Sequence, residues 1–169
     1  MDVVCLKPFD FTDDYIYGYE DNEKIGSALF KFPTSSDIPN ILAASCANPN
    51  LILPFDTDDD IARKKRRICL NQGKEHTGWG EAGGPTALTK ALQYFNLIDY
   101  AKPFTFFYPI HYAIWQSIFD DTLKNDMALF HDTYAIHLWN EMGRRVGFDK
   151  NATYPYNSLF EQLKRKYLS

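Results

Sequence analysis

Apolar residues follow two different patterns along this chain, one typical of helices and one typical of strands. Helical spacing is clearest after residue 85, where one apolar stripe is formed by Leu88, Ala91, Leu92 and Phe95. Residues 3–6, in contrast, form a short β-branched run that ends just before a proline, a pattern typical of a buried strand. No apolar run approaches the roughly 18 residues of a membrane-spanning helix. We therefore expect a fold that combines short helices with short strands.

The same two patterns predict the remaining elements. Alternation predicts strands over residues 15–19 and 27–32, paired as a hairpin, and residues 104–108 are predicted to form a strand that ends at Pro109. Helical spacing and capping residues predict helices over residues 37–46, 56–70, 115–119 and 159–167. Residues 128–140 fit either a helix or a strand, because their apolar residues match both periods.

Composition limits the classes of protein to which the chain can belong. Its 169 residues show no internal repeat and no low-complexity linker, so we expect one domain over residues 1–169. The 18 Lys and Arg residues against 22 Asp and Glu residues leave no basic excess, which argues against nucleic-acid binding. Aromatic residues make up 16% of the chain, more than a core of this size needs. The surplus suits an interface or a sugar-like or planar ligand.

The three cysteines are odd in number, far apart and free of any Cys-x-x-Cys pair. We expect Cys5, Cys46 and Cys69 to be reduced thiols that act as small apolar packing residues.

Residues 56–70 place their acidic side chains before their basic ones, an order that suits the dipole of a helix. The basic run at residues 63–67 matches a nuclear targeting signal or a patch that binds anionic membranes. The carboxylates beside it favour the alternative interpretation, which is a solvated helix face.

A polar, glycine-rich stretch covers residues 72–84 and leads directly into the helix predicted to begin at Pro85. Glycines before a helix N-terminus allow an anion or a hydroxyl-rich ligand to approach the backbone. This stretch is therefore a candidate ligand-binding segment.

Three sequence motifs occur in a characteristic order along the chain. They are Asp-Val-Val-Cys-Leu-Lys-Pro at residues 2–8, Gly-Pro-Thr-Ala-Leu-Thr at 84–89 and Tyr-Ala-Ile-His-Leu-Trp-Asn at 134–140, with Phe-Tyr-Pro-Ile at 107–110 between the second and third. In this order they resemble the sugar transferases of glycosyltransferase family 32. That family includes alpha-1,4-galactosyltransferase-like enzymes, initiating mannosyltransferases of fungi and bacterial capsular polysaccharide transferases.

The resemblance implies an α/β fold of the GT-A type, in which a nucleotide-binding sheet ends in an Asp-x-Asp motif that holds a divalent metal. The metal, Mn²⁺ or Mg²⁺, neutralises the charge of the leaving nucleotide diphosphate. The motif's second Asp corresponds to Asp2, which places the first Asp and the nucleotide-binding strands before residue 1. The chain is then expected to be N-terminally truncated and to contain only the C-terminal part of the fold. Further Asp-x-Asp pairs within residues 56–60 are expected by chance from the composition.

The resemblance also implies the site residues. Asp2 and His137 would hold the metal, although a hydrogen-bonded structural role for His137 is an equal alternative. Contacts with substrate are implied for Gly84, Pro85, Thr89 and Trp139. Thr89 has the alternative of a polar helix face, and Trp139 that of a core residue. No catalytic residue is assigned.

The function implied is metal-dependent transfer of a sugar from a nucleotide-diphosphate donor to a hydroxyl of a glycan or glycolipid. The alternative is a non-catalytic remnant or subunit that self-associates or binds a partner chain supplying the missing half. A sheet without its first strands would expose an unpaired edge, and such an edge is normally covered or paired. The reduced thiols favour the cytoplasm, with membrane association, and the Golgi lumen is the expectation for a eukaryotic source.

Overall fold

The computed structural model describes residues 2–123 and 130–168. The chain divides into two compact units, of which one comprises Phe11–Pro103 and the other combines the two ends of the chain. The regular elements of the described residues are short helices and one small sheet, which is compatible with the expected α/β fold. No helix in this described part of the chain is long and apolar enough to cross a membrane.

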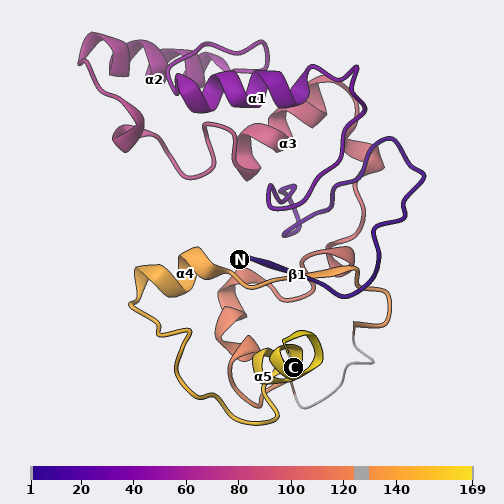
Figure 1. Ribbon diagram of the computed structural model, residues 1–169. Helices are drawn as coiled ribbons and strands as arrows, with labels where there is room; N and C mark the ends of the chain where they lie inside the picture. The colour runs from indigo at the N-terminus through magenta and orange to yellow at the C-terminus, as the bar shows by residue number, and fades with distance from the viewer. Residues whose placement is uncertain (1, 124–129, 169) are drawn as a thin grey trace. The chain divides into compact units, whose positions relative to one another are not determined.

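The unit Phe11–Pro103 is built on three helices, α1 (Ile38–Ala47), α2 (Asp58–Cys69) and α3 (Pro85–Tyr94), and on short 3-10 turns at Lys74–His76 and Ile98–Tyr100. Helix α1 packs against α3 (Figure 1). The core of this unit consists of Tyr17, Ile25, Ile38, Leu42, Ala87, Leu88, Ala91 and Leu92. All three helices lie close to their predicted positions.

Helix α3 confirms the predicted apolar stripe except at its last position. Leu88, Ala91 and Leu92 are fully buried, whereas Phe95 is 38% exposed. The prediction for Phe95 was wrong because the helix ends at Tyr94. Phe95 is the C-cap, and the next residue turns the chain away through a positive φ of 56°.

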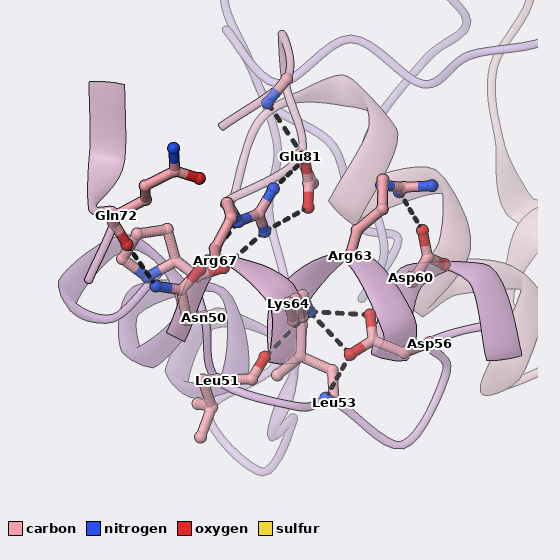
Figure 2. Close-up of polar contacts among 12 residues, drawn as sticks. Asn50, Leu51, Leu53, Asp56, Asp60, Arg63, Lys64, Arg67, Gln72 and Glu81 are labelled. Atoms are coloured by element: carbon pink, nitrogen blue, oxygen red, sulfur yellow. Dashed lines mark hydrogen bonds and ion pairs between the residues drawn. The ribbon is translucent and has the colours of Figure 1, made fainter. Parts of the chain in front are cut away.

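Helix α2 begins with a capping box in which Thr57 and Asp60 each bond the other's backbone N–H. The prediction of a solvated basic face was wrong at two positions, because Lys64 and Arg67 are 2% and 6% exposed. Each is buried with a carboxylate partner, Asp56 and Glu81 respectively (Figure 2). Helical spacing places the two cations on the face that packs inward, where only paired charges are tolerated.

The hairpin predicted over residues 15–32 forms only as separate bridges. Ile16 pairs with Lys31 and Tyr19 pairs with Ile25, and both pairings are antiparallel. They do not share one register, so no continuous ladder can form between them. Neither predicted strand is therefore a strand of the structure.

The second unit contains the sheet, in which β1 (Val3–Cys5) runs antiparallel to β2 (Ala135–His137). It also contains 3-10 helices at Phe104–Phe106 and Tyr112–Ile118 and the helices α4 (Asn140–Arg145) and α5 (Leu159–Tyr167). The ambiguous stretch 128–140 is thus a strand followed by a helix start in its described part, and residues 128–129 lie outside the described residues.

Two further predictions for this unit and for the cysteines were wrong. Residues 104–108 do not form a strand, because the amides of Phe107 and Tyr108 both donate to the carbonyl of Phe104 and close a local turn. Cys5, Cys46 and Cys69 are free thiols, as expected, but all three are exposed rather than packed.

Candidate functional site

The two-stranded sheet brings Asp2 and His137 together from opposite ends of the chain. Val3 lies opposite His137 in the antiparallel register, so the residue before β1 meets the residues after β2. The Asp2 carbonyl accepts from Leu138 N at 2.8 Å, and Asp2 Oδ1 accepts from Asn140 N at 2.9 Å. These bonds fix Asp2 so that its Oδ2 lies 3.2 Å from His137 Nε2.

The ring of His137 is oriented by the backbone that follows it. Trp139 N donates to His137 Nδ1 at 3.2 Å, and a backbone N–H can only donate, so Nδ1 is unprotonated. The neutral ring therefore has its proton on Nε2 and donates it to Asp2. This bond, together with that from Asn140, holds the pKa of the Asp2 carboxyl below its ordinary value, while partial burial opposes the shift.

Trp139 packs its ring against His137 at 4.2 Å between ring centroids in an edge-to-face arrangement. Its indole Nε1 donates to Ile110 O at 2.8 Å, and the side chain is buried. The backbone of Trp139 is left-handed, with φ of 52° and ψ of 40°, which costs on the order of 1–3 kcal/mol in a residue with a side chain. Strain of this kind is typical of sites where a side chain must be held in one place.

The donors at this point of the sheet, a carboxylate oxygen and an imidazole nitrogen 3.2 Å apart, are ligand types that an Mn²⁺-like ion accepts. His137 Nε2 can bind such an ion only when its proton is on Nδ1 instead, which breaks the hydrogen bond from Trp139 N. With that rearrangement, Asp2 and His137 fit the ion. Within residues 2–123 and 130–168, no third His, Cys, Asp or Glu joins them in a metal-binding group.

The other predicted site residues lie in the unit Phe11–Pro103, at the start of α3. Gly84 is the N-cap and packs so tightly that a Cβ there would lie 2.6 Å from Gly80 Cα. Pro85 has no N–H, and Ala87 N donates to Gly80 O, so these two positions offer no amide to a ligand. The Thr89 hydroxyl donates to Pro85 O at 2.7 Å and accepts from Ile25 N at 2.9 Å.

A pocket of about 530 Å³ opens beside α3 in the same unit. Thr86, Thr89, Lys90 and Gln93 line it from the helix, and the loop around Lys24 lines it from the other side. Sequence reasoning found Thr89 here but missed its neighbours. These neighbours could have been predicted, because residues three or four positions apart in the helix that begins at Pro85 lie on the same face.

The predicted residues thus form two groups. Asp2, His137 and Trp139 are brought together by β1 and β2, while Gly84, Pro85 and Thr89 belong to the other unit. Within the first group, Trp139 is a buried core residue that also packs against His137, which agrees with the core alternative, and its contact with substrate stays a prediction.

Comparison with known proteins finds a matching family and a curated relative. Residues 78–167 match a family model described as the alpha 1,4-glycosyltransferase conserved region. The lactosylceramide 4-alpha-galactosyltransferase of Rattus norvegicus is 26% identical over 115 residues, which cover 59% of this chain and 31% of the relative. The chain therefore spans about a third of the length of this curated relative. No solved structure matches the chain.

The matched region covers more than half of the chain and includes both α3 and the strand that presents His137. A match of this extent shows the family, and the chain belongs to the alpha 1,4-glycosyltransferases.

Proposed function

We propose that this chain takes part in the metal-dependent transfer of a sugar from a nucleotide-diphosphate donor to a hydroxyl of a glycan or glycolipid. The observation that carries the proposal is the meeting of Asp2 and His137 at the sheet, with Oδ2 and Nε2 3.2 Å apart. A carboxylate and an imidazole from segments more than 130 residues apart converge here in a chain of a glycosyltransferase family.

In this proposal the chain carries part of a GT-A fold of family 32, and Asp2 is the second carboxylate of its Asp-x-Asp motif. Asp2 and His137 would hold the cation. When bound, the cation stabilises the negative charge that develops on the leaving diphosphate. The remaining work falls to the protein: the backbone amide of Asn140 orients the Asp2 carboxylate, and the indole of Trp139 supports the His137 ring.

The name of the rat relative describes transfer of galactose to lactosylceramide. We extend this to a hexose as the transferred sugar and a galactose-terminated glycolipid or glycan as the acceptor. Substrate contacts at Gly84, Pro85, Thr89 and Trp139 stay predictions. At Thr89 the hydroxyl already makes two hydrogen bonds, so one acceptor site remains for a ligand.

Electron paramagnetic resonance of Mn²⁺ tests the proposal, because free Mn²⁺ gives a sharp signal that is lost on binding. The chain is titrated with Mn²⁺ in the presence of UDP or GDP, and the titration is repeated with Asp2→Asn and His137→Gln. We expect each substitution to weaken Mn²⁺ binding by at least about 10-fold, because each removes one of the donors.

Matched controls come from the same unit. His131 and Asp132 are highly exposed, with side-chain exposures of 87% and 81%, and contact each other at 2.9 Å. His131→Gln and Asp132→Asn should therefore leave Mn²⁺ binding unchanged. If the unaltered chain binds no Mn²⁺ with either nucleotide, or if Asp2→Asn binds it equally well, the proposed metal site is wrong.

A further inference from the structure

One wall of the pocket beside α3 is the polar face of that helix. Four lining residues share this face, because they stand three or four positions apart. They are Thr86, Thr89, Lys90 and Gln93. The opposite face of α3 packs into the core of the unit through the fully buried residues Leu88, Ala91 and Leu92. This wall is therefore fixed by the packing of the helix.

The second wall is the loop of residues 19–24, which is closed by its own hydrogen bonds. The backbone amides of Glu23 and Lys24 both donate to Asp21 Oδ1, at 2.8 and 2.7 Å. Glu20 N donates to Lys24 O at 2.8 Å. The loop therefore presents its side chains from an ordered backbone.

Thr89 joins the two walls. Its hydroxyl accepts from Ile25 N, directly after the loop, at 2.9 Å and donates to Pro85 O within α3 at 2.7 Å. Thr89 is 7% exposed, so these bonds are shielded from water. The walls are thereby held together, and the pocket is formed before any ligand binds, which lowers the cost of binding.

The lining of the pocket combines apolar surface with hydrogen-bonding groups. Tyr19 and Ile98 pack against the core of the unit and also line the pocket. The side-chain amides of Asn22 and Gln93 each offer donors and an acceptor, and the Glu23 carboxylate offers acceptors. These three polar residues are exposed, so their side-chain ends are available to a ligand.

The charges that line the pocket favour a neutral ligand. Lys90 Nζ donates to the buried Asp60 carboxylate, so its charge is already paired. Glu23 and Lys24, which are adjacent in the chain, carry opposite charges. A nucleotide diphosphate is bound best where unpaired cations outnumber carboxylates, and the described lining residues do not provide that excess.

A sugar ring suits these features. The pocket volume of about 530 Å³ falls within the range of roughly 300–1,000 Å³ that is usual for small-molecule sites. A pyranose carries several hydroxyls, each of which can both donate and accept, and it has an apolar C–H face. Amide and carboxylate groups bind such hydroxyls, while apolar side chains such as Tyr19 and Ile98 cover the C–H face.

We propose that this pocket is a binding site for a neutral hexopyranose, with Asn22, Glu23 and Gln93 as the residues that bind its hydroxyls. The choice of a sugar as the ligand rests on the proposed function. Two sources share this chemistry, the acceptor glycan and the sugar of the nucleotide donor.

Heteronuclear NMR of the ¹⁵N-labelled full chain tests the proposal, because the side-chain amides of Asn22 and Gln93 give signals of their own. Asn22→Ala and Gln93→Ala assign these signals by removing them. Lactose represents the acceptor, UDP-galactose the donor, and mannitol, an acyclic polyol, controls for nonspecific effects.

We expect both amide signals to shift, with saturation, on addition of lactose or of UDP-galactose, and the sugar that causes the shift identifies the source. Signals that move with neither sugar, or equally with mannitol, overturn the proposal. Shifts that UDP alone reproduces show a site for anions and also overturn it.

The affinity for the sugar that binds is then compared among variants. Glu23→Ala and Gln93→Ala should each weaken binding by about 3- to 10-fold, because each removes a hydrogen-bonding group. The matched control is Asp59→Ala, at an exposed carboxylate of α2 outside the pocket lining, which should bind the sugar as the unaltered chain does. Unchanged affinity in both Glu23→Ala and Gln93→Ala overturns the proposal.

Mn²⁺ binding, measured separately by paramagnetic resonance, should be unchanged in Gln93→Ala. The two sites can therefore fail independently. Mn²⁺ binding without sugar binding refutes the sugar pocket alone, whereas sugar binding in the pocket without Mn²⁺ binding refutes the metal site alone.

Discussion

The buried ion pair between Lys64 and Asp56 offers a sharp test of how α2 is held in place. Lys64 Nζ donates to Asp56 Oδ1 at 2.8 Å, Asp56 Oδ2 at 2.6 Å and Leu51 O at 2.8 Å. The side chains of the pair are 2% and 5% exposed. Asp56 Oδ2 also accepts from Leu53 N at 2.7 Å, so this one carboxylate neutralises the ammonium and closes the loop before α2.

Asp56→Ala leaves the buried ammonium of Lys64 with one carbonyl and no counter-charge. Removing one partner of a buried pair costs about 3–5 kcal/mol of unfolding free energy. With a urea m-value of about 2 kcal/mol/M, the unfolding midpoint should fall by roughly 1.5–2.5 M. Such a loss is a large fraction of the stability of a chain of this size.

Urea unfolding followed by far-ultraviolet circular dichroism measures the effect, and a double-mutant cycle isolates the pair. Asp56→Ala combined with Lys64→Met removes both charges, so it should cost less than Asp56→Ala alone. Lys65→Met, at an exposed neighbouring position on α2, should change the unfolding free energy by less than about 0.5 kcal/mol. If Asp56→Ala costs no more than Lys65→Met, or if the double variant is as unstable as the sum of the singles, the pair is not a buried and coupled one.

Two further substitutions test other features. Burial raises the pKa of the Glu20 carboxyl to about 7, so its charged form is disfavoured in the folded state and stability is lost as the pH rises from about 4.5 through 7. Glu20→Gln should abolish this loss, so its unfolding free energy at pH 8 should exceed that of the unaltered chain by about 1–3 kcal/mol, with no gain at pH 4. Urea unfolding at both pH values measures this difference. An equal effect of the substitution at pH 4 and pH 8 would contradict the reasoning. Gly84→Ala should lower the unfolding free energy by about 1–3 kcal/mol, because its Cβ would lie 2.6 Å from the Gly80 backbone. The control is Gly143→Ala in α4, where the added Cβ would meet Phe148 and Trp115 only at ordinary distances of 3.4 Å or more. Thermal melts in which Gly143→Ala is the more destabilising of the two would contradict the argument.

The helices could be predicted from the sequence because their signals are local. Pro85 begins α3 and Thr57 caps α2, and both act within one helical turn. The capping role of Ser158 is equally local, and its hydroxyl accepts from the amide of Glu161 at 3.2 Å. The strands of residues 15–32 were mispredicted, because alternation indicates which residues can pair and not whether two pairings share a register.

Burial of charge was the second point at which the sequence was insufficient. A basic run beside carboxylates is most often solvated. Lys64 and Arg67 are buried because Asp56 and Glu81 arrive from loops before and after α2 to neutralise them. Only the folded chain shows which carboxylate meets which cation.

For the candidate site, the sequence by itself determined which residue types are present and where the helices and the first strand begin. Asp2 and His137 were singled out by their motifs, and nothing local indicated that they meet. Their approach was decided by the antiparallel register of β1 and β2, which aligns Val3 with His137 and places the Asp2 carboxylate 3.2 Å from the imidazole. The physical reason is that capping and helical periodicity act over a few residues, whereas strand pairing and the neutralisation of buried charge join segments distant in the chain and depend on the packing of the whole unit.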